Sequence, residues 1–341
     1  MKTPPAKFYI DPARLRKEYD RVFARSWQLV GHIGQLAKPG DYFTATVAGE
    51  PLVLVNDGGT IRGFFNVCRH RAGPLAYGCG NAQRFVCRYH GWAYDFSGKL
   101  LHASEMEGAE GFDPKEIRLE PVTVHRFGPL LFVALDPATV PFDEYFPELT
   151  RRCAPLGLER MRYVTTREYP VKANWKVYVD NYLEGYHIPL VHPTLNRELD
   201  YRQYVTEECE RYTLQYAPVK EGTAERYKAG AGDGRAYYYW LFPNIMLNIY
   251  EGQMQTNVVV PVDASLTVVR FDWFAFEPVP DPNTDARWIE LARFSEEIQE
   301  EDARICEAVQ VNLASRAYRS GPYSPKREGG VRLFHRLMLE P

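Results

Sequence analysis

The sequence predicts an α+β protein in which an all-β module precedes a larger domain built on an antiparallel sheet. Between Gly40 and about Asp136 the chain consists of short runs rich in β-branched and aromatic residues, separated by Gly-Gly, Gly-Pro and Ser-Gly turns. Farther along, strand-like runs are flanked by helical patterns at residues 174–187 and about 285–318. The long helix therefore comes late, after the strands that it accompanies.

A proline-rich stretch separates the two parts of the chain. Pro137, Pro141 and Pro147 fall within eleven residues and interrupt any periodic pattern, so we place the domain boundary there. Upstream, Asp11 and Pro12 begin a run with apolar residues at helical spacing, which predicts an amphipathic helix. The predicted organisation is a helical N-terminal segment packing on the C-terminal domain, the all-β module, and the C-terminal domain, at residues 1–38, 39–140 and 141–341.

Composition and charge exclude several classes of protein. The 341 residues include 41 basic and 44 acidic side chains, a formal net charge of −3, without a long like-charge run, so no nucleic-acid partner is expected. No run of about 18 apolar residues could cross a bilayer, and the N-terminus lacks the apolar core of a signal peptide, so we expect a cytoplasmic protein with no membrane partner. Six cysteines are too few for a secreted disulfide scaffold, and two lie beside histidines, which directs attention to metal binding.

The sharpest functional signal is a C-x-H…C-x₂-H pattern. It consists of Cys68 and His70 in one predicted loop and, after sixteen intervening residues, Cys87 and His90 in another. Two such loops can offer two thiolates and two imidazoles to one site. In a Rieske centre two cysteines bind one iron of a [2Fe–2S] cluster and two histidines bind the other, which raises the reduction potential above that of an all-cysteine cluster. The alternative is a structural Cys₂His₂ zinc site, although zinc fingers pair cysteine with cysteine and histidine with histidine.

A second candidate site follows in the C-terminal domain, where Glu184, His187 and His192 fall within nine residues. Glu184 and His187 are spaced i,i+3, which makes them neighbours on a helix, and Pro189 then disrupts the helix and lets His192 turn inward. Two histidines and one carboxylate form the facial triad of non-haem Fe(II) oxygenases, which leaves positions open for O₂ and substrate. A structural pair of histidines is the alternative; the upstream motif favours metal, because a Rieske centre in the same chain needs an electron acceptor.

The third ligand is predicted on the late helix. Apolar residues recur there at spacings of three and four, which predicts a stripe facing the core. The members of this stripe are Trp288, Leu291, Ile298, Ile305 and Val309. Asp302 falls on the stripe, whereas Glu301 points about 60° the other way, at about 100° per residue. An unpaired carboxylate on a buried face is unfavourable, so Asp302 needs a cation such as iron, or strong donors. The alternative is a carboxylate at the edge of the stripe that reaches solvent or an arginine.

Three short segments resemble a known family. NVCRHRAGPL and CRYHGWAYDFSGKL resemble the Rieske motif of ring-hydroxylating and related oxygenases. Respiratory Rieske proteins carry an extra cysteine in each loop, and those places hold Gly73 and Tyr89 here. EEDARICEAVQ resembles the late helix that supplies the aspartate ligand in oxygenases acting on N-methylated compounds. The chain is thus similar to the α-subunits of Rieske non-haem iron oxygenases, nearest to the group acting on glycine betaine, choline, stachydrine and carnitine.

This resemblance implies a fold, cofactors and partners. The fold would be an all-β Rieske domain beside a helix-grip, START-like catalytic domain, and the cofactors a Rieske [2Fe–2S] cluster and a mononuclear Fe(II). The resemblance also implies a head-to-tail homotrimer in which the cluster of one chain faces the iron of its neighbour. Glu184 would then be an inter-subunit electron-transfer bridge and not an iron ligand. Because no G-x-G-x-x-G fingerprint is present, electrons from NAD(P)H would arrive through a separate flavin/iron–sulfur reductase.

The expected reaction is the O₂-dependent hydroxylation or oxidative N-demethylation of a small organic substrate. An aromatic strand and the residues after it are the predicted pocket lining, namely Tyr239, Asn244, Met246 and Asn248. Aromatic side chains there could hold an N-methyl or quaternary ammonium group by cation–π attraction, or could pack the core. Two alternatives stay open: an oxygenase that dihydroxylates or O-demethylates aromatic compounds, and a non-catalytic Rieske electron-transfer protein.

Overall fold

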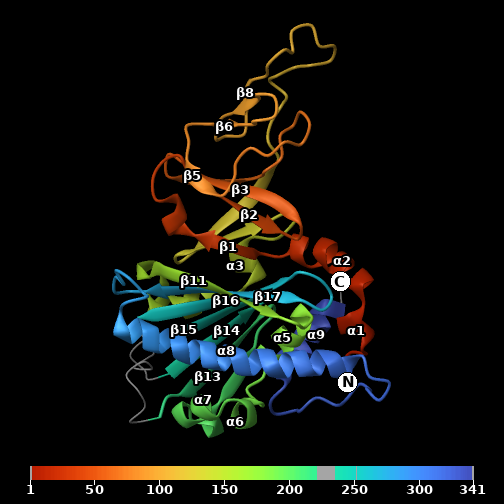
Figure 1. The fold of residues 1–341 in the computed structure, drawn as a ribbon, viewed down its shortest axis with the longest axis vertical. Coiled ribbons are helices and arrows are strands. Elements are labelled where there is room, and N and C mark those ends of the chain that lie inside the picture. The colour runs from red at the N-terminus through yellow and green to blue at the C-terminus, as the bar shows by residue number, and fades with distance from the viewer. Residues whose placement is uncertain (1, 221–234, 251, 340–341) are drawn as a thin grey trace. The chain divides into compact units, whose positions relative to one another are not determined.

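The computed structural model describes residues 2–220, 235–250 and 252–339, and the chain divides into two compact units (Figure 1). The larger unit combines Met1–Glu18 with Pro141–Pro341, and the smaller unit is Tyr19–Val140. The segment predicted at 1–38 is therefore shared between the two units, because residues 28–32 form strand β1 of the smaller one. Leu29 and Val30 are buried in that sheet, so this stretch does not continue the N-terminal helices.

The smaller unit consists of two antiparallel sheets. Seven strands form the first in the order β1-β10-β9-β4-β3-β2-β5, and three short strands form the second in the order β6-β7-β8. The strand bounds are β1 (Gln28–His32), β2 (Asp41–Val47), β3 (Glu50–Asp57), β4 (Thr60–Phe65), β5 (Cys79–Asn81), β6 (Phe85–Val86), β7 (Ala93–Tyr94), β8 (Leu100–His102), β9 (Pro121–Phe127) and β10 (Leu130–Ala134). The predicted all-β architecture of this part of the chain is confirmed.

Strand β3 supports hydrophobic clusters on both of its faces. Leu52 and Leu54 belong to one cluster, and Val53 and Val55 to the other, in agreement with the alternation of side chains along a strand. All four side chains are completely buried. The cluster around Val53 also contains the two cysteines of the C-x-H…C-x₂-H pattern, so the loops that carry them rest on a well-packed core.

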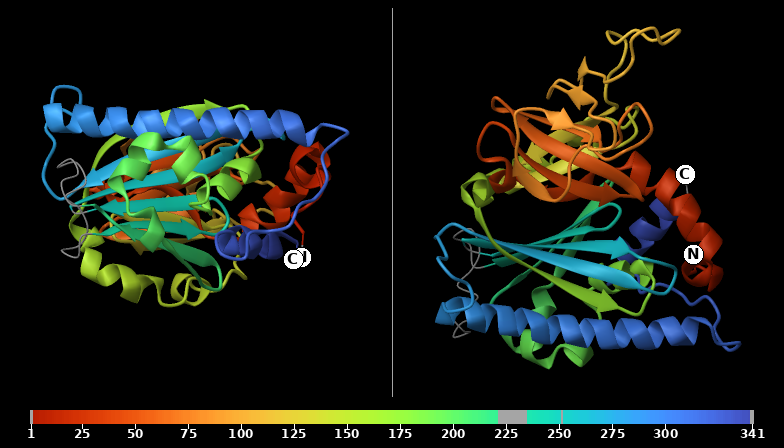
Figure 2. Two further views of the ribbon diagram at one scale, coloured as in Figure 1. Left: turned by 90° about the horizontal axis from the view of Figure 1, so that it is seen from below. Right: turned by 45° about the horizontal axis from the view of Figure 1, so that its top comes forward.

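In the larger unit the described residues form a seven-stranded antiparallel sheet in the order β11-β17-β16-β15-β14-β13-β12. Its strands are β11 (Arg162–Val171), β12 (Val205–Glu208), β13 (Tyr212–Pro218), β14 (Arg235–Leu241), β15 (Ile245–Tyr250), β16 (Gln253–Pro261) and β17 (Thr267–Ala275). Helix α8 (Ala286–Leu313) runs along one face of this sheet (Figure 2). An antiparallel sheet with a long, late helix confirms the α+β fold predicted for this part of the chain.

Shorter helices precede, interrupt and follow these strands. They are α1 (Lys7–Ile10), α2 (Pro12–Arg21), α3 (Phe142–Tyr145), α4 (Leu149–Cys153), α5 (Trp175–Tyr182), α6 (Ile188–Val191), α7 (Pro193–Glu198) and α9 (Gly329–Leu339). Short 3₁₀ turns are η1 (Phe23–Arg25), η2 (Ile33–Leu36), η3 (Ala154–Leu156), η4 (Leu158–Arg160) and η5 (Tyr201–Gln203). Across the described residues, no helix is both long and apolar enough to span a membrane.

Helix α8 faces the core along a different line from the one predicted. The predicted stripe is correct at Trp288, which is 6% exposed, but wrong at Ile305 and Val309, which are 38% and 39% exposed. The buried line runs one residue farther along, at seven-residue spacing, through Ala292, Gln299, Cys306 and Leu313. Small and polar side chains occupy much of this line. A prediction based on large apolar residues therefore falls on the neighbouring line of the helix.

A buried charge network joins the first residues of the chain to helix α5. The Nζ atom of Lys176 lies 2.9 and 2.8 Å from the two carboxylate oxygens of Glu18, and the indole N–H of Trp175 donates to the same carboxylate at 2.9 Å. Lys176 and Glu18 are 1% and 3% exposed. Because buried charges are tolerated only when paired and hydrogen-bonded, this network accounts for the packing of residues 1–18 with the larger unit.

Candidate active site and metal centres

Two loops of the smaller unit bring together the four residues of the C-x-H…C-x₂-H pattern. Cys68 and His70 follow strand β4, and Cys87 and His90 follow strand β6. The two imidazole rings lie 4.7 Å apart between centroids. The two cysteines are 3% and 2% exposed, whereas His70 is exposed and His90 half-buried. The thiols therefore face the core and the imidazoles face outward, where an electron-transfer partner can approach.

Aromatic residues from strand β7 and the segment before it surround this site. The hydroxyl of Tyr94 lies 3.2 Å from Sγ of Cys68 and accepts a hydrogen bond from the backbone N–H of Arg69 at 3.1 Å. The indole of Trp92 stacks on the ring of His70, with centroids 4.7 Å apart and an interplanar angle of 6°. These contacts orient one thiol and one imidazole of the pattern.

The surroundings of Cys87 fit a metal cluster better than a free thiol. A Cβ atom at Gly73 would lie 2.7 Å from Sγ of Cys87, so only glycine fits there. Burial raises the pKa of the Cys87 thiol, and a thiolate at this place therefore needs a positive partner. The four side chains form two pairs, with the thiols buried and the imidazole rings close together farther out. This arrangement fits a binuclear cluster with one ligand pair per iron.

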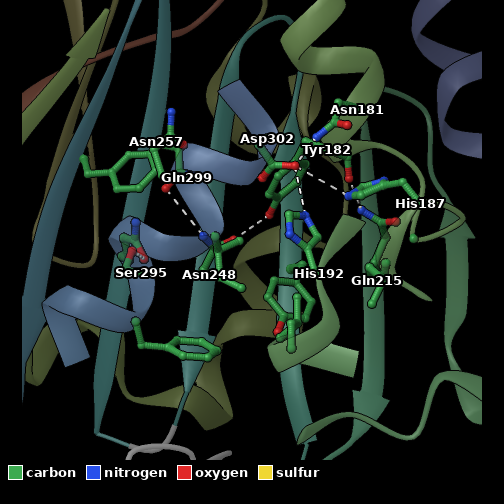
Figure 3. Close-up of a pocket in the computed structure, with 18 of the residues that line it drawn as sticks. Asn181, Tyr182, His187, His192, Gln215, Asn248, Asn257, Ser295, Gln299 and Asp302 are labelled. Carbon is green, nitrogen blue, oxygen red and sulfur yellow. Dashed lines mark hydrogen bonds and ion pairs between the residues drawn. The ribbon is translucent and has the colours of Figure 1, made fainter. Parts of the chain in front are cut away.

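A second group of ligand-type side chains meets in the larger unit (Figure 3). The potential ligand atoms of His187, His192 and Asp302 all lie within 4.8 Å of one another. His187 lies between α5 and α6, His192 lies between α6 and α7, and Asp302 is on α8. The structure therefore brings together the three residues that the sequence analysis selected as a facial triad.

Each of the two histidines contacts a glutamate carboxylate through the Nδ1 atom of its ring. Nδ1 of His187 lies 2.8 Å from Glu184, and Nδ1 of His192 lies 2.7 Å from Glu301. The Nε2 atoms of the two rings face Oδ1 of Asp302, at 3.6 and 3.0 Å. An ionised carboxylate only accepts hydrogen bonds, so each ring nitrogen that faces one can carry a proton. A metal that takes the place of the proton on Nε2 would leave each Nδ1–H donating to its glutamate.

The electrostatics of the triad favour a bound cation. Burial by itself lowers the pKa of His192, but Asp302 and Glu301 raise it above its ordinary value. Among the described residues, Asp302 pairs with no lysine or arginine, and its neutral donor is the side-chain amide of Asn181, at 2.6 Å. The arginine-paired alternative is therefore wrong for Asp302. A site with this donor set and excess negative charge fits Fe(II).

The helix predicted at residues 174–187 ends earlier than expected, and residues 184–187 form a turn. Helix α5 ends at Tyr182, and the Glu184 carboxylate accepts from the backbone N–H of His187 at 3.0 Å as well as from its ring. Pro189 lies in the first turn of the short helix α6. Proline suits a helix start, so it begins a new element here instead of ending a longer one.

Glu301 is a site residue that the sequence analysis missed. The helical wheel placed it away from the core-facing stripe, and it also lies away from the observed buried line of α8. Its half-buried side chain nevertheless reaches Nδ1 of His192. Consecutive residues on a helix differ by about 100°, which lets Glu301 and Asp302 contact His192 through its two ring nitrogens. The sequence signal that could have identified Glu301 is its position directly before Asp302.

A cavity of about 120 Å³ lies beside the triad and is lined by α5, α8 and strands of the sheet. Asn248 lines it, as predicted, but three other predicted lining residues do not, namely Tyr239, Asn244 and Met246. On strand β14 it is Tyr238 that pairs with Asn248 and shares its face, so Tyr239 points to the opposite side of the sheet. Asn244 lies in the turn before β15 and donates to the carbonyl of Val259, and Met246 is completely buried near the start of β15.

Aromatic side chains line one part of the cavity. Tyr238 and Tyr250 meet edge to face, with ring centroids 6.0 Å apart and an interplanar angle of 83°. Tyr182 and Tyr204 line the same cavity, and burial, followed by the hydroxyls of Tyr204 and Tyr250, raises the pKa of Tyr182. Phe294 of helix α8 adds a fifth ring to the lining. The result is an aromatic surface beside the triad.

Neutral amides line another part of the cavity. Asn248 accepts a hydrogen bond from the hydroxyl of Tyr182 at 2.7 Å, and its amide nitrogen lies 3.4 Å from the side-chain oxygen of Asn257. Gln299 accepts a hydrogen bond from the hydroxyl of Tyr178. Asn248, Asn257 and Gln299 lie on one side of the cavity, with the two histidines of the triad on the other (Figure 3).

Two family descriptions match the chain. Residues 26–113 match "Rieske [2Fe-2S] domain", and residues 158–340, more than half of the chain, match "Ring hydroxylating alpha subunit (catalytic domain)". The chain is a Rieske non-haem iron oxygenase. This oxygenase therefore carries a Rieske [2Fe–2S] cluster and a mononuclear iron, and the non-catalytic electron-transfer alternative is excluded.

Relatives of this oxygenase cover almost its whole length. A chloroplastic choline monooxygenase of Arabidopsis thaliana is 35% identical over 355 residues, which cover 99% of this chain and 83% of the relative. The carnitine monooxygenase oxygenase subunit of Escherichia coli (strain K12) is 33% identical over 356 residues, covering 99% of this chain and 93% of the relative. The similarity to this family thus covers both units of the chain and extends beyond the short motifs.

Solved structures agree with this assignment. The quaternary ammonium Rieske monooxygenase CntA in complex with L-carnitine matches this oxygenase with a TM-score of 0.86 at 28% identity, covering 98% of this chain and 94% of that one. A naphthalene 1,2-dioxygenase with bound indole matches with a TM-score of 0.77 at 19% identity, which shows a shared fold alone. The predicted α+β architecture with a Rieske domain is confirmed.

Proposed function

We propose that this oxygenase is the terminal component of a monooxygenase for a small compound with an N-methyl or quaternary ammonium group. The observation that carries the proposal is the aromatic surface beside the triad, formed by Tyr182, Tyr204, Tyr238, Tyr250 and Phe294. Ring faces attract a cationic ammonium group, most strongly where water is excluded. The relatives named as choline and carnitine monooxygenases support the same substrate class.

The metal ligands follow from the two sites described above. In the smaller unit, the [2Fe–2S] cluster would be held by Cys68, His70, Cys87 and His90. In the larger unit, Fe(II) would be held by His187, His192 and Asp302. Bound in this way, the iron supplies the O₂ activation that protein side chains lack. In the overall reaction one oxygen atom enters a C–H bond and the other leaves as water, with two electrons and two protons consumed.

The chain's own residues position the substrate and the ligands. Glu184 and Glu301 hold the two imidazoles in one tautomer, so both Nε2 atoms stay available without rearrangement. The aromatic surface would bind the ammonium group and keep water from it. Asn181, hydrogen-bonded to Asp302, restricts that carboxylate to one orientation.

The electron path and the partners extend this proposal. Glu184 would act as the inter-subunit bridge of a homotrimer, and its side chain is 15% exposed, so one edge remains open to a neighbouring chain. A separate NAD(P)H-dependent flavin/iron–sulfur reductase would deliver the electrons. The cytoplasmic location expected from the sequence stays a prediction, since the relatives include chloroplastic enzymes of plants and a bacterial enzyme.

A single-turnover experiment tests the substrate class against the aromatic alternative. The iron-replete protein, with its cluster reduced, is mixed with O₂ and either N-methylated or aromatic compounds, and the products are identified by mass spectrometry. We expect an oxygen-containing or N-demethylated product, in proportion to O₂ consumed, from the N-methylated series. Coupled turnover confined to the aromatic series would overturn the proposal and favour a ring-oxidising or O-demethylating enzyme.

A further inference from the structure

We propose that the substrate carries, besides its ammonium group, a hydroxyl and not a carboxylate, and that Gln299 is the residue that recognises this hydroxyl. The inference rests on the proposed function, because it takes the ammonium group as given. It adds the chemical class: a quaternary ammonium alcohol in preference to a quaternary ammonium acid. Three observations on the cavity carry it.

The first observation is the charge of the cavity. Among its described lining residues there is no lysine or arginine, and the charged members are the acids Glu184 and Asp302 together with the two histidines of the triad. A carboxylate that left water for this lining would lose its hydration without gaining an ion pair with a side chain. It would also be repelled by Glu184. A hydroxyl meets neither penalty.

The second observation is a buried donor without a partner. Gln299 is 2% exposed, its oxygen accepts from the hydroxyl of Tyr178, and within the described residues its Nε2 atom has no hydrogen-bond partner. Buried amide groups are nearly always satisfied by protein, water or ligand. Burial raises the pKa of Tyr178, so its hydroxyl stays protonated and keeps the Gln299 oxygen occupied. Because Gln299 is among the residues that line the cavity, we assign its free amide hydrogens to an acceptor on the substrate.

The third observation is that neighbouring amides form a neutral surface on the same side. Asn248 and Asn257 are 8% and 4% exposed, come from β15 and β16, and lie together with Gln299 of α8 (Figure 3). Tyr182 fixes Asn248 through its hydroxyl. An amide offers both donors and acceptors, and a hydroxyl can use both, whereas a carboxylate only accepts. This surface therefore matches an alcohol better than an acid.

Binding to the unaltered holoenzyme decides between the two classes. Dissociation constants are measured by calorimetry for choline, glycine betaine and tetramethylammonium, which present a hydroxyl, a carboxylate and neither group. We expect choline to bind about threefold to tenfold more tightly than tetramethylammonium, the gain of roughly one hydrogen bond, and glycine betaine to bind more weakly than both. Binding of glycine betaine as tight as that of choline would overturn this inference and leave the proposed function standing. Failure of all three to bind would remove the proposed function itself.

Two substitutions at Gln299 test the assigned residue. Gln299→Leu removes the amide donor. Gln299→Glu also removes it but keeps an oxygen that accepts from Tyr178, so the test can still be made if the leucine variant fails to fold. In both variants the advantage of choline over tetramethylammonium should fall to about one. Gln203→Leu is the matched control, because this glutamine is exposed on η5 and outside the cavity lining. An unchanged choline preference in either folded Gln299 variant would overturn the assignment.

Discussion

The carboxylate of Glu301 lies 2.7 Å from Nδ1 of His192, while Oδ1 of the next residue, Asp302, lies 3.0 Å from Nε2 of the same ring. Two consecutive residues of helix α8 therefore contact both nitrogens of one imidazole. The ring is 1% exposed and has no freedom to exchange these partners for water. Glu301 thus fixes the tautomer of His192 without occupying the place of a ligand, in the same way as Glu184 does for His187.

The role of Glu301 can be measured as iron affinity. In Glu301→Gln the amide either loses the charge-assisted hydrogen bond or favours the wrong tautomer of His192, so the affinity for the mononuclear iron should fall about tenfold to a hundredfold. The readout is iron retained during dialysis against a graded series of chelators, with the cluster absorbance as an internal reference. Glu300→Gln is the control, since that side chain is exposed on the same helix turn. Equal retention in the two variants would contradict the prediction.

Asp302 is expected to be required for one iron and dispensable for the other two. Asp302→Asn removes the negative charge of the triad but leaves the loops of the smaller unit untouched. Iron per chain should therefore drop from about three to about two. Iron and acid-labile sulfide analyses on the same sample measure both sites. Retention of three irons by the variant would argue against Asp302 as a ligand.

Glu184 is expected to matter for electron transfer more than for metal content. In Glu184→Ala the affinity for the mononuclear iron should fall as in Glu301→Gln, but excess iron should fill both metal sites because the ligand set is intact, while the electron path between subunits is interrupted. Rapid mixing of the reduced variant with substrate and O₂ should then show a cluster that reoxidises slowly without forming product. Iron analysis of the same preparation separates this result from simple loss of iron. Normal product formation by a variant replete in both metals would refute the bridge.

The hydroxyl of Tyr94 should raise the reduction potential of the cluster. It lies 3.2 Å from Sγ of Cys68, and burial raises its pKa, so it stays a hydrogen-bond donor. A donor to a cluster ligand stabilises the more negative reduced state. Tyr94→Phe should therefore lower the potential in a spectroscopically monitored redox titration. Tyr77→Phe, at a ring that is 63% exposed, serves as the control, and identical potentials in the two variants would count against the contact.

The buried pair of Lys176 and Glu18 supplies a prediction about stability. Lys176→Met leaves the buried Glu18 carboxylate with Arg14, at 3.0 Å, as its remaining cation and should lower the free energy of unfolding by about 1–3 kcal/mol. The double variant Glu18→Gln with Lys176→Met removes both charges and should recover a large part of that loss. Denaturant unfolding of all four proteins measures the coupling. Additive effects of the two single substitutions would show that the pair does not interact.

The same pair predicts a pH dependence. Burial, partly opposed by Glu18, lowers the pKa of Lys176 to about 8, whereas an unfolded chain has a lysine pKa of about 10.4. Between these values the unfolded state binds more protons than the folded state, so this residue makes the protein more stable as the pH rises from about 8 to about 10.4. Below pH 8 the contribution is constant and unfavourable. Stability measured relative to Lys176→Met across this range should show the rise, and a flat difference would contradict it.

Much of both metal sites could be read from local spacing. Cys68 and His70 lie two residues apart and Cys87 and His90 three, so a single tight turn suffices to bring each pair together. His187 and His192 are likewise joined by a short segment, and they converge although a short helix, α6, lies between them in place of the irregular turn expected. Short segments have few conformations, and the residue types in them limit the chemistry.

The site residues that only the tertiary structure identified lie on long helices and strands. Asp302 was predicted on the correct helix, but the buried line of α8 is one residue away from the apolar stripe, so Gln299 was not anticipated. Glu301 lies outside both lines and still contacts His192. On strand β14 the pocket face passes through Tyr238 and not Tyr239.

The sequence by itself determined the fold class and the family and predicted the ligand types of the two metal sites, because these depend on composition, local spacing and motifs. The tertiary structure decided which face of a helix or strand meets the cavity. That face is set by packing between elements far apart in the chain. If a helix or strand turns by one residue, a polar or aromatic side chain faces the cavity where an apolar one was expected.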